Sequence, residues 1–170
     1  MTDLQYPIGQ FQLPKEVTSQ QVKEWIDDIR LLPMQLAEAL SGASEQALAK
    51  TYRENGWTVK QLVHHIADSH MNSYIRFKLA LTEDVPTIKP YNEAEWAQLP
   101  DSAMPVATSY NLIENLHERW VYLLSNLKDE QLQRAFNHPD SGLTTLEQAI
   151  GLYAWHGKHH LAHIQFALGA

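Results

Sequence analysis

Helical periodicity is the feature that most limits how this chain can fold. Apolar residues recur at spacings of three and four, and no convincing alternating strand pattern is present. The clearest stretch opens with a capping-box pattern, Thr58-x-x-Gln61. Its stripe consists of Val59, Leu62, Val63, Ile66, His70, Tyr74, Phe77 and Leu81. A 3.6-residue period places such a stripe on one face of a helix, so we expect an all-α protein.

The same pattern divides the chain into four long helices and two short ones. The predicted helices cover residues 18–40, 45–52, 58–83, 109–127, 129–135 and 144–167. The first opens with Thr18-x-x-Gln21 and is perturbed by Pro33, and the last opens with Thr144-x-x-Glu147. On the third long helix we expect an inward face of Leu112, Ile113, Leu116, Trp120 and Leu123. Four long helices joined by one long connection are typical of a four-helix bundle.

Two segments are predicted to be irregular within a single domain spanning 1–170. The first is an N-terminal arm over residues 1–16. The second is a crossover over residues 84–108, which contains four prolines. Connections of that length are either disordered or functional, for example as lids. Tyr91 and Trp96 favour a packed segment, because disordered segments are poor in aromatic residues.

Composition excludes several classes of function. The chain has 170 residues, no cysteine and a formal net charge of −7. Sulfur ligands, thiolate nucleophiles and disulfides are therefore excluded. No basic cluster suggests a nucleic-acid partner, and no apolar run is long enough for a membrane span. The N-terminus lacks a signal-peptide pattern, so we expect a cytoplasmic protein.

Nine histidines are the unusual feature, and four of them fall in the sequence WHGKHHLAH at 155–163. At about 100° per residue, His156 and His160 lie on the inner shoulder of the final helix. They are one turn apart and can share an ion. His159 and His163 have the same spacing but are predicted to point outward. Gly157 would let another helix or a ligand approach closely. Because an isolated pair is weak evidence for a metal site, a third ligand is needed from another helix.

The second long helix offers His65 as that ligand. His65 lies on one shoulder of the apolar stripe, followed by Ser69, Asn72 and Arg76 at i+4, i+7 and i+11. A polar strip headed by a histidine is what a substrate groove beside a metal would need. The alternative interpretation is the ordinary solvent boundary of an amphipathic helix.

Other histidines are better explained by packing. His64 is predicted to point away from the stripe, and His70 to be a core histidine satisfied by a hydrogen bond. Glu114-x-x-His117 matches half of a di-iron motif but occurs once, so we expect His117 to be a packing residue.

Several segments together resemble a known family. They are GWTVKQLVHHIADSHMNSYIRFKLALTED (56–84), KPYNEAEW (89–96), LHERW (116–120), HPDSG (138–142), GLYAWHGKHHLAHI (151–164) and the arm YPIG (6–9). This set is similar to the YfiT-like branch of the DinB superfamily, described as metal-dependent hydrolases and as bacillithiol S-transferase-like proteins. The resemblance implies an up-down-down-up bundle with the long crossover between helices two and three, and a homodimer.

The resemblance also implies a ligand set. The three metal-binding histidines of the family fall on His65, His156 and His160. The wider superfamily often has Arg-Gly-Gln after the last ligand, where this chain has Leu-Ala-His163. His163 is therefore a candidate acid, base or supporting residue, and Asp68 is a candidate for orienting a ligand imidazole.

Three neutral imidazoles with an open position are typical of a catalytic divalent metal. We expect zinc first and nickel next, with iron or manganese as further options. The main prediction is a hydrolase in which metal-bound water attacks a small-molecule substrate. The first alternative is a thiol S-transferase of bacillithiol type, which binds a low-molecular-weight thiol with help from Asn72 and Arg76. The second is a non-catalytic module that binds a metal or a small thiol.

Overall fold

The structure is a computed structural model that describes residues 4–169. Its elements are α1 (Ser19–Leu40), α2 (Glu45–Leu48), α3 (Val59–Thr82), α4 (Glu93–Trp96), the 3-10 helix η1 (Pro100–Ala103), α5 (Val106–Ser125), α6 (Asp129–Leu132), β1 (Ala135–His138), β2 (Gly142–Thr145) and α7 (Leu146–Leu168). Residues 1–3 of the predicted arm, and residue 170, lie outside the described part.

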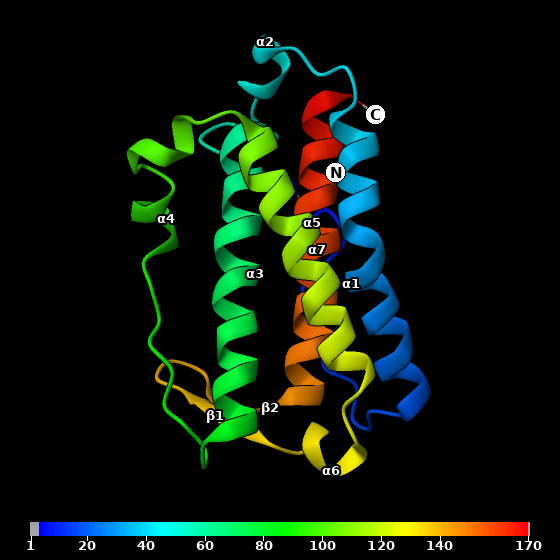
Figure 1. Ribbon diagram of the computed structural model, residues 1–170. Helices are drawn as coiled ribbons and strands as arrows, with labels where there is room; N and C mark the ends of the chain where they lie inside the picture. Colours follow the sequence, from blue (N-terminus) through cyan, green and yellow to red (C-terminus); the bar gives the residue numbers. More distant parts are fainter. Residues whose placement is uncertain (1–3, 170) are drawn as a thin grey trace.

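Helices α1, α3, α5 and α7 form a four-helix bundle, as predicted (Figure 1). Following the chain, α1 runs up, α3 and α5 run down, and α7 runs up (Figure 1). Each helix packs against two others, in the pairs α1–α7, α7–α3, α3–α5 and α5–α1. The crossover returns along the bundle from the end of α3 to the start of α5, which makes α3 and α5 parallel (Figure 1).

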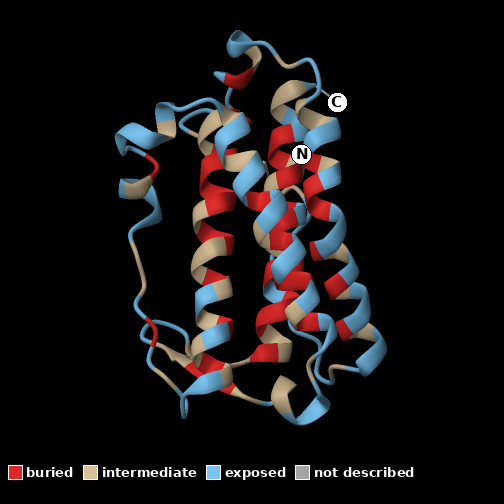
Figure 2. Cartoon of the chain, in the orientation of Figure 1, coloured by how far each residue is buried: buried red, intermediate tan, exposed pale blue. Residues whose placement is uncertain are grey.

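Buried residues lie on the sides of the four helices that face one another (Figure 2). One cluster contains Trp120 and Phe77, and a second contains Leu36, Leu62 and Ile113. The predicted face of α5 is partly wrong, because Leu112 is 43% exposed while His117, Val121 and Leu124 are buried. Ile113 and Trp120 of the predicted face are buried, and the hydrogen-bonded His117 belongs to the buried face in place of Leu112.

Threonine side chains cap three of the long helices. Thr18 caps α1, and Thr58 forms the predicted capping box with Gln61 at α3. At α7 the capping box is Thr145 with Gln148, one residue later than predicted. The reason is that Thr144 belongs to β2.

A two-stranded antiparallel hairpin precedes α7 and is an addition to the predicted helical bundle. β1 and β2 pair from Ala135↔Thr145 to His138↔Gly142. Gly142 has φ +80°, a left-handed conformation that glycine adopts without strain. Strands of four residues are too short to show a clear alternating pattern.

The crossover is an ordered segment that is anchored to this hairpin. Backbone hydrogen bonds join Ile88 N to Asn137 O at 3.0 Å and Asn137 N to Pro86 O at 2.9 Å. Further along, the rings of Tyr91 and Trp96 pack 4.4 Å apart. α5 begins at Val106, so the predicted boundary at residue 108 is late. Between residues 4 and 169, no helix combines the length and apolarity needed to cross a membrane.

Candidate metal centre

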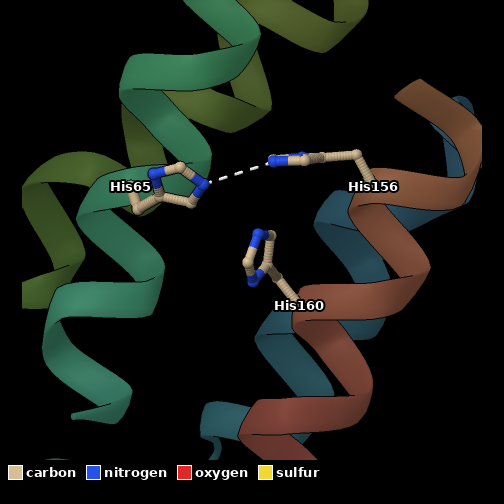
Figure 3. Close-up of side chains that lie close together, drawn as sticks. All are labelled: His65, His156 and His160. Carbon is tan, nitrogen blue, oxygen red and sulfur yellow. Dashed lines mark hydrogen bonds between the residues drawn. The ribbon is translucent and has the colours of Figure 1, made fainter. Parts of the chain in front are cut away.

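Three histidines from two facing helices converge on one point. His65 comes from α3, and His156 and His160 come from α7 (Figure 3). One ring nitrogen from each lies within 4.8 Å of the others, and His65 Nε2 is 3.2 Å from His156 Nε2. The geometry therefore brings together the three residues expected from the sequence.

This donor set fits a divalent transition metal. Metal–nitrogen bonds of 2.0–2.1 Å in tetrahedral geometry place two nitrogens about 3.3 Å apart, close to the observed 3.2 Å. Three imidazoles suit zinc, nickel, copper or iron better than calcium or magnesium. The histidines line a pocket of about 400 Å³ that opens to solvent, which leaves access for a fourth ligand.

A chain of hydrogen bonds through the core orients His156. His156 Nδ1 is 3.1 Å from His70 Nε2, and His70 Nδ1 is 2.8 Å from His117 Nε2. His117 Nδ1 in turn lies 2.7 Å from the carbonyl oxygen of Ile29. A carbonyl only accepts, so in neutral rings each Nδ1 donates and the Nε2 lone pair of His156 faces His65. These hydrogen bonds satisfy both ring nitrogens of the predicted core histidine, His70, and of the predicted packing histidine, His117.

Burial keeps these rings neutral near pH 7. It lowers the pKa of His65 from 6.5 to about 4, with a smaller contribution from His159. Burial likewise lowers the pKa of His156 and of His160 well below the usual value, helped by neighbouring histidines. Metal ligation requires neutral imidazole, so the unprotonated donors are available at neutral pH.

The predicted outward direction of His159 and His163 is wrong. His159 is 7% exposed and His163 is 2% exposed. The carbonyl oxygen of Leu4 in the arm accepts from His163 Nε2 at 3.1 Å, and the ring of Tyr52 stacks on His163 at 3.9 Å. A helical wheel of α7 alone contains no information about the arm and loop that cover this side.

The sequence predicts only that His64 points away from the apolar stripe, and the structure shows what lies on that side. His64 is buried, because the start of α5 and the end of the crossover cover it. Its Nδ1 is 2.7 Å from Ser109 Oγ, and its Nε2 is 3.0 Å from the carbonyl oxygen of Met104.

The pocket is built from five parts of the chain: the arm, the loop before α3, α3 itself through His65, α4 and α7. Of its described lining residues, Glu93 is the only carboxylate and Arg53 the only lysine or arginine. Trp57 packs against His65, with ring centroids 4.7 Å apart. Sequence reasoning missed these three as site residues, although Trp57 and Glu93 lie in the segments that carry the family resemblance.

The predicted substrate-binding residues of the polar strip, Ser69, Asn72 and Arg76, are not among the described residues that line the pocket. Ser69 Oγ is 3.5 Å from His156 Nε2, at the edge of the histidine cluster. Arg76 lies near Glu93, where its positive charge counteracts the rise in the pKa of Glu93 that burial causes. Asn72 donates its amide to the carbonyl oxygen of Asp68 on its own helix, at 2.8 Å.

Asp68 lies toward η1 rather than the pocket. Burial, together with the nearby charge of Asp101, raises the pKa of Asp68 to about 6. It is absent from the described residues that line the pocket. Within that part of the chain, no hydrogen bond links its side chain to His65, His156 or His160.

Comparison with known proteins gives the same fold and a consistent chemistry. Two curated relatives, from Bacillus cereus strain AH820 and Bacillus anthracis strain A0248, are 57% identical over 164 residues, covering 96% of this chain and 95% of theirs. Both are named "putative metal-dependent hydrolase". Both names describe the relatives as "putative" hydrolases that depend on a metal.

Solved structures extend the comparison. YfiT from Bacillus subtilis, described as "a probable metal-dependent hydrolase with an unusual four-helix bundle topology", is 46% identical, with a TM-score of 0.94 and coverage of 97% of this chain and 95% of its own. A mycothiol-dependent maleylpyruvate isomerase shares the fold alone, at 16% identity, a TM-score of 0.68 and coverage of 84% and 60%. The model of the DinB superfamily matches residues 28–164. With its bundle, its histidine cluster and these relatives, the chain belongs to the DinB superfamily.

Proposed function

We propose that the protein is a metal-dependent hydrolase that holds one divalent ion through His65, His156 and His160, with zinc the first candidate and nickel the second. The observation that supports this most is the convergence of three neutral ring nitrogens on a solvent-accessible pocket. The close relatives named as hydrolases favour hydrolysis as the reaction. A pocket of about 400 Å³ suits a small-molecule substrate.

An ion bound there would act as a Lewis acid and make water a nucleophile near neutral pH. The protein must supply a proton acceptor, and Glu93 is placed in the pocket for this role. Arg76 favours its ionised form, because a nearby positive charge lowers the pKa of a carboxyl group. We propose Glu93 ahead of His163 and Asp68, since His163 Nε2 is committed to Leu4 and Asp68 lies toward η1.

Substrate contacts are proposed for the polar strip. Ser69 lies closest to the histidines and can donate a hydrogen bond to a bound group. Arg76 lies close enough to Glu93, which lines the pocket, for its charge to act on that carboxyl group. Asn72 is the weakest of the three candidates, because its amide donor is already used within α3.

Thiol S-transfer and non-catalytic binding remain alternatives that use the same histidines. The likeness to a mycothiol-dependent enzyme is a likeness of fold and does not favour either. The homodimer and the cytoplasmic location implied by the resemblance and by the sequence also remain predictions.

The test combines metal analysis with turnover. Purified protein would be stripped with a chelator, reloaded with Zn²⁺ or Ni²⁺, and assayed against panels of esters, amides and phosphoesters, and against thiol acceptors with a small thiol. We expect one ion per chain and hydrolysis in the wild type, whereas His65→Ala should lose hydrolysis and bind the ion more weakly. His138→Ala is the matched control, because His138 lies in the hairpin and is absent from the pocket lining. Turnover only in the thiol panel would support transfer instead, and His65→Ala with full metal content and activity would refute the site.

A further inference from the structure

A second group of histidines lies beside the first on α7. One ring nitrogen each from His159, His160 and His163 lies within 4.8 Å of the others. His160 belongs to both groups. Figure 3 shows one of its ring nitrogens turned toward His65 and His156, and the other turned away from them.

The tautomer of His163 leaves a lone pair directed at His160. Its Nε2 lies 3.1 Å from the carbonyl oxygen of Leu4, which can only accept, so Nε2 carries the hydrogen. In the neutral ring, Nδ1 then has a free lone pair, and it is 3.4 Å from Nδ1 of His160. This separation exceeds the usual 2.7–3.2 Å of an N–H hydrogen bond. It matches the distance of about 3.3 Å expected between two nitrogen ligands of a tetrahedral ion.

His159 contributes an independent observation. Its Nδ1 is buried and has no hydrogen-bond partner in the described part of the chain. The side chain is held in place by stacking on Trp155 at 4.5 Å, and the ring of Tyr6 lies 5.9 Å away. A buried polar atom without a partner is costly, and it calls for a ligand that the protein atoms do not provide. By contrast, the second nitrogen of His156 is satisfied by His70.

We propose that His159, His160 and His163 form a second binding site for a divalent transition metal of borderline softness, such as Zn²⁺. The carbonyl of Leu4 orients His163 as a backbone acceptor orients a metal-binding imidazole. Because a neutral His160 has a single lone pair, one ion occupies either the first triad or the second, and the wild-type protein binds one equivalent near neutral pH. This site goes beyond the proposed hydrolase centre, which uses the other triad.

The test removes the first triad and keeps the second. Protein stripped of metal would be dialysed against Zn²⁺, and bound zinc would be measured by elemental analysis. In His65→Ala/His156→Ala, His160 is the last remaining residue of the first triad, and we expect close to one equivalent of zinc at lower affinity. Adding His163→Ala should abolish binding, whereas adding the control His138→Ala should leave it unchanged. His163→Ala alone should retain one equivalent in the first triad.

Three results would overturn the second site, and they are distinguishable from failure of the first. The wild type binding one equivalent while the folded double variant binds none would refute the second triad and leave the proposed hydrolase centre standing. Zinc retained by the variant that also carries His163→Ala would show that other residues hold it. A wild type that binds no zinc would reject both. If the alanine pair does not fold, as judged by circular dichroism, His65→Gln/His156→Gln keeps the side-chain volume and decides the question.

Discussion

His117 lies on α5, is 1% exposed, and donates to the carbonyl oxygen of Ile29 at 2.7 Å. His117 does not line the pocket. Its tautomer nevertheless fixes the tautomer of His70, which in turn determines which nitrogen of His156 carries a lone pair. A backbone carbonyl in α1 therefore sets the protonation pattern of a proposed ligand in α7. Orientation of this kind raises the basicity of a ligand and fixes its ring.

Replacing His117 tests that relay at the level of one residue. In His117→Leu, the Nδ1 of His70 loses its acceptor, so we expect zinc affinity to fall about 10–100-fold. The buried unpaired groups should also cost about 1–3 kcal/mol of unfolding free energy. Chelator competition measures the affinity, and urea unfolding of the metal-free protein measures the stability.

A purely structural effect is excluded by a matched variant on the same helix. Ile113→Ala removes a buried side chain of α5 that takes no part in the relay. It should destabilise the fold by about 2–5 kcal/mol and leave zinc affinity close to that of the wild type. Equal affinity in His117→Leu and the wild type would contradict the relay.

Glu93 carries the second prediction at this scale. Glu93→Gln keeps the size of the side chain and removes the proton acceptor, so we expect kcat to fall about 10²–10⁴-fold with metal content unchanged. The neighbouring Glu95→Gln, on the same short helix but outside the pocket lining, should retain activity. Since the carboxylate is the active form, wild-type activity should rise with pH through the raised pKa of Glu93. A Glu93→Gln enzyme with wild-type turnover would remove Glu93 from the mechanism.

At the scale of the elements, capping threonines explain which boundaries the sequence predicts well. Thr18 and Thr58 each precede an amphipathic run and mark the starts of α1 and α3. The start of α7 is ambiguous, because Thr144 and Thr145 both have a suitable partner three residues later. The choice between them depends on the hairpin pairing, which is a tertiary feature.

In the candidate site, too, features set by local sequence could be predicted, whereas features set by tertiary contacts could not. The spacing of His156 and His160 and the position of His65 are local properties of two helices, and sequence reasoning found them. Burial of His159 and His163 depends on contacts with Leu4 and Tyr52, far away in the sequence. The position of Glu93 in the pocket depends on how the crossover folds back, which no periodicity encodes.

Gly157 gives a prediction about how two helices pack. A Cβ at this position would lie 2.7 Å from Cδ2 of Leu32 in α1, and Leu32 is 2% exposed. Alanine normally stabilises a helix by about 1 kcal/mol relative to glycine. Here we expect Gly157→Ala to destabilise the protein by about 1–3 kcal/mol in urea unfolding, because the buried leucine has little room to move.

A second background separates the clash with Leu32 from an effect of the substitution on the helix backbone. In a Leu32→Ala background the clash is removed, so Gly157→Ala should cost less there than in the wild type. In the wild-type background, Gly157→Ala should also weaken zinc binding, because a shift of α7 at residue 157 would displace the neighbouring His156. An unchanged or higher stability for Gly157→Ala in the wild-type background would contradict this account of the α1–α7 contact.

At the scale of the whole molecule, the bundle contains an unusual number of buried neutral histidines. Burial lowers the pKa of His65, His70, His117, His156, His159, His160 and His163. For His65 and for His117 the pKa falls from 6.5 to about 4. Several histidines that would be protonated in the unfolded chain below pH 6.5 therefore stay neutral in the folded protein.

This burial predicts sensitivity to acid. Between pH 6.5 and about 4 the unfolded chain binds more protons than the folded one, so stability is complete above pH 6.5 and is lost as the pH falls. The slope for each such histidine approaches about 1.4 kcal/mol per pH unit. The raised pKa values of Asp68 and Glu93 act in the opposite direction, but these two carboxyl groups are outnumbered by the seven histidines.

Thermal unfolding of the metal-free protein, followed by circular dichroism from pH 7.5 to 4.5, measures the effect. We expect a nearly constant Tm above pH 7 and a steep fall below pH 6.5. Zinc should raise Tm at pH 7, and this gain should disappear at acid pH as the ligands become protonated. A Tm that stays level between pH 7 and pH 5 would show that the buried histidines do not titrate in this way.

The contact between Leu4 and His163 spans 159 positions of the sequence. During synthesis the arm emerges long before α7, so its partner does not yet exist. Closing so long a loop is slow compared with forming local helical contacts. We therefore expect the bundle to assemble before the arm docks, with the histidines of α7 still open to solvent in the interval. An ion could enter by that route, and the docked arm would afterwards narrow its way out.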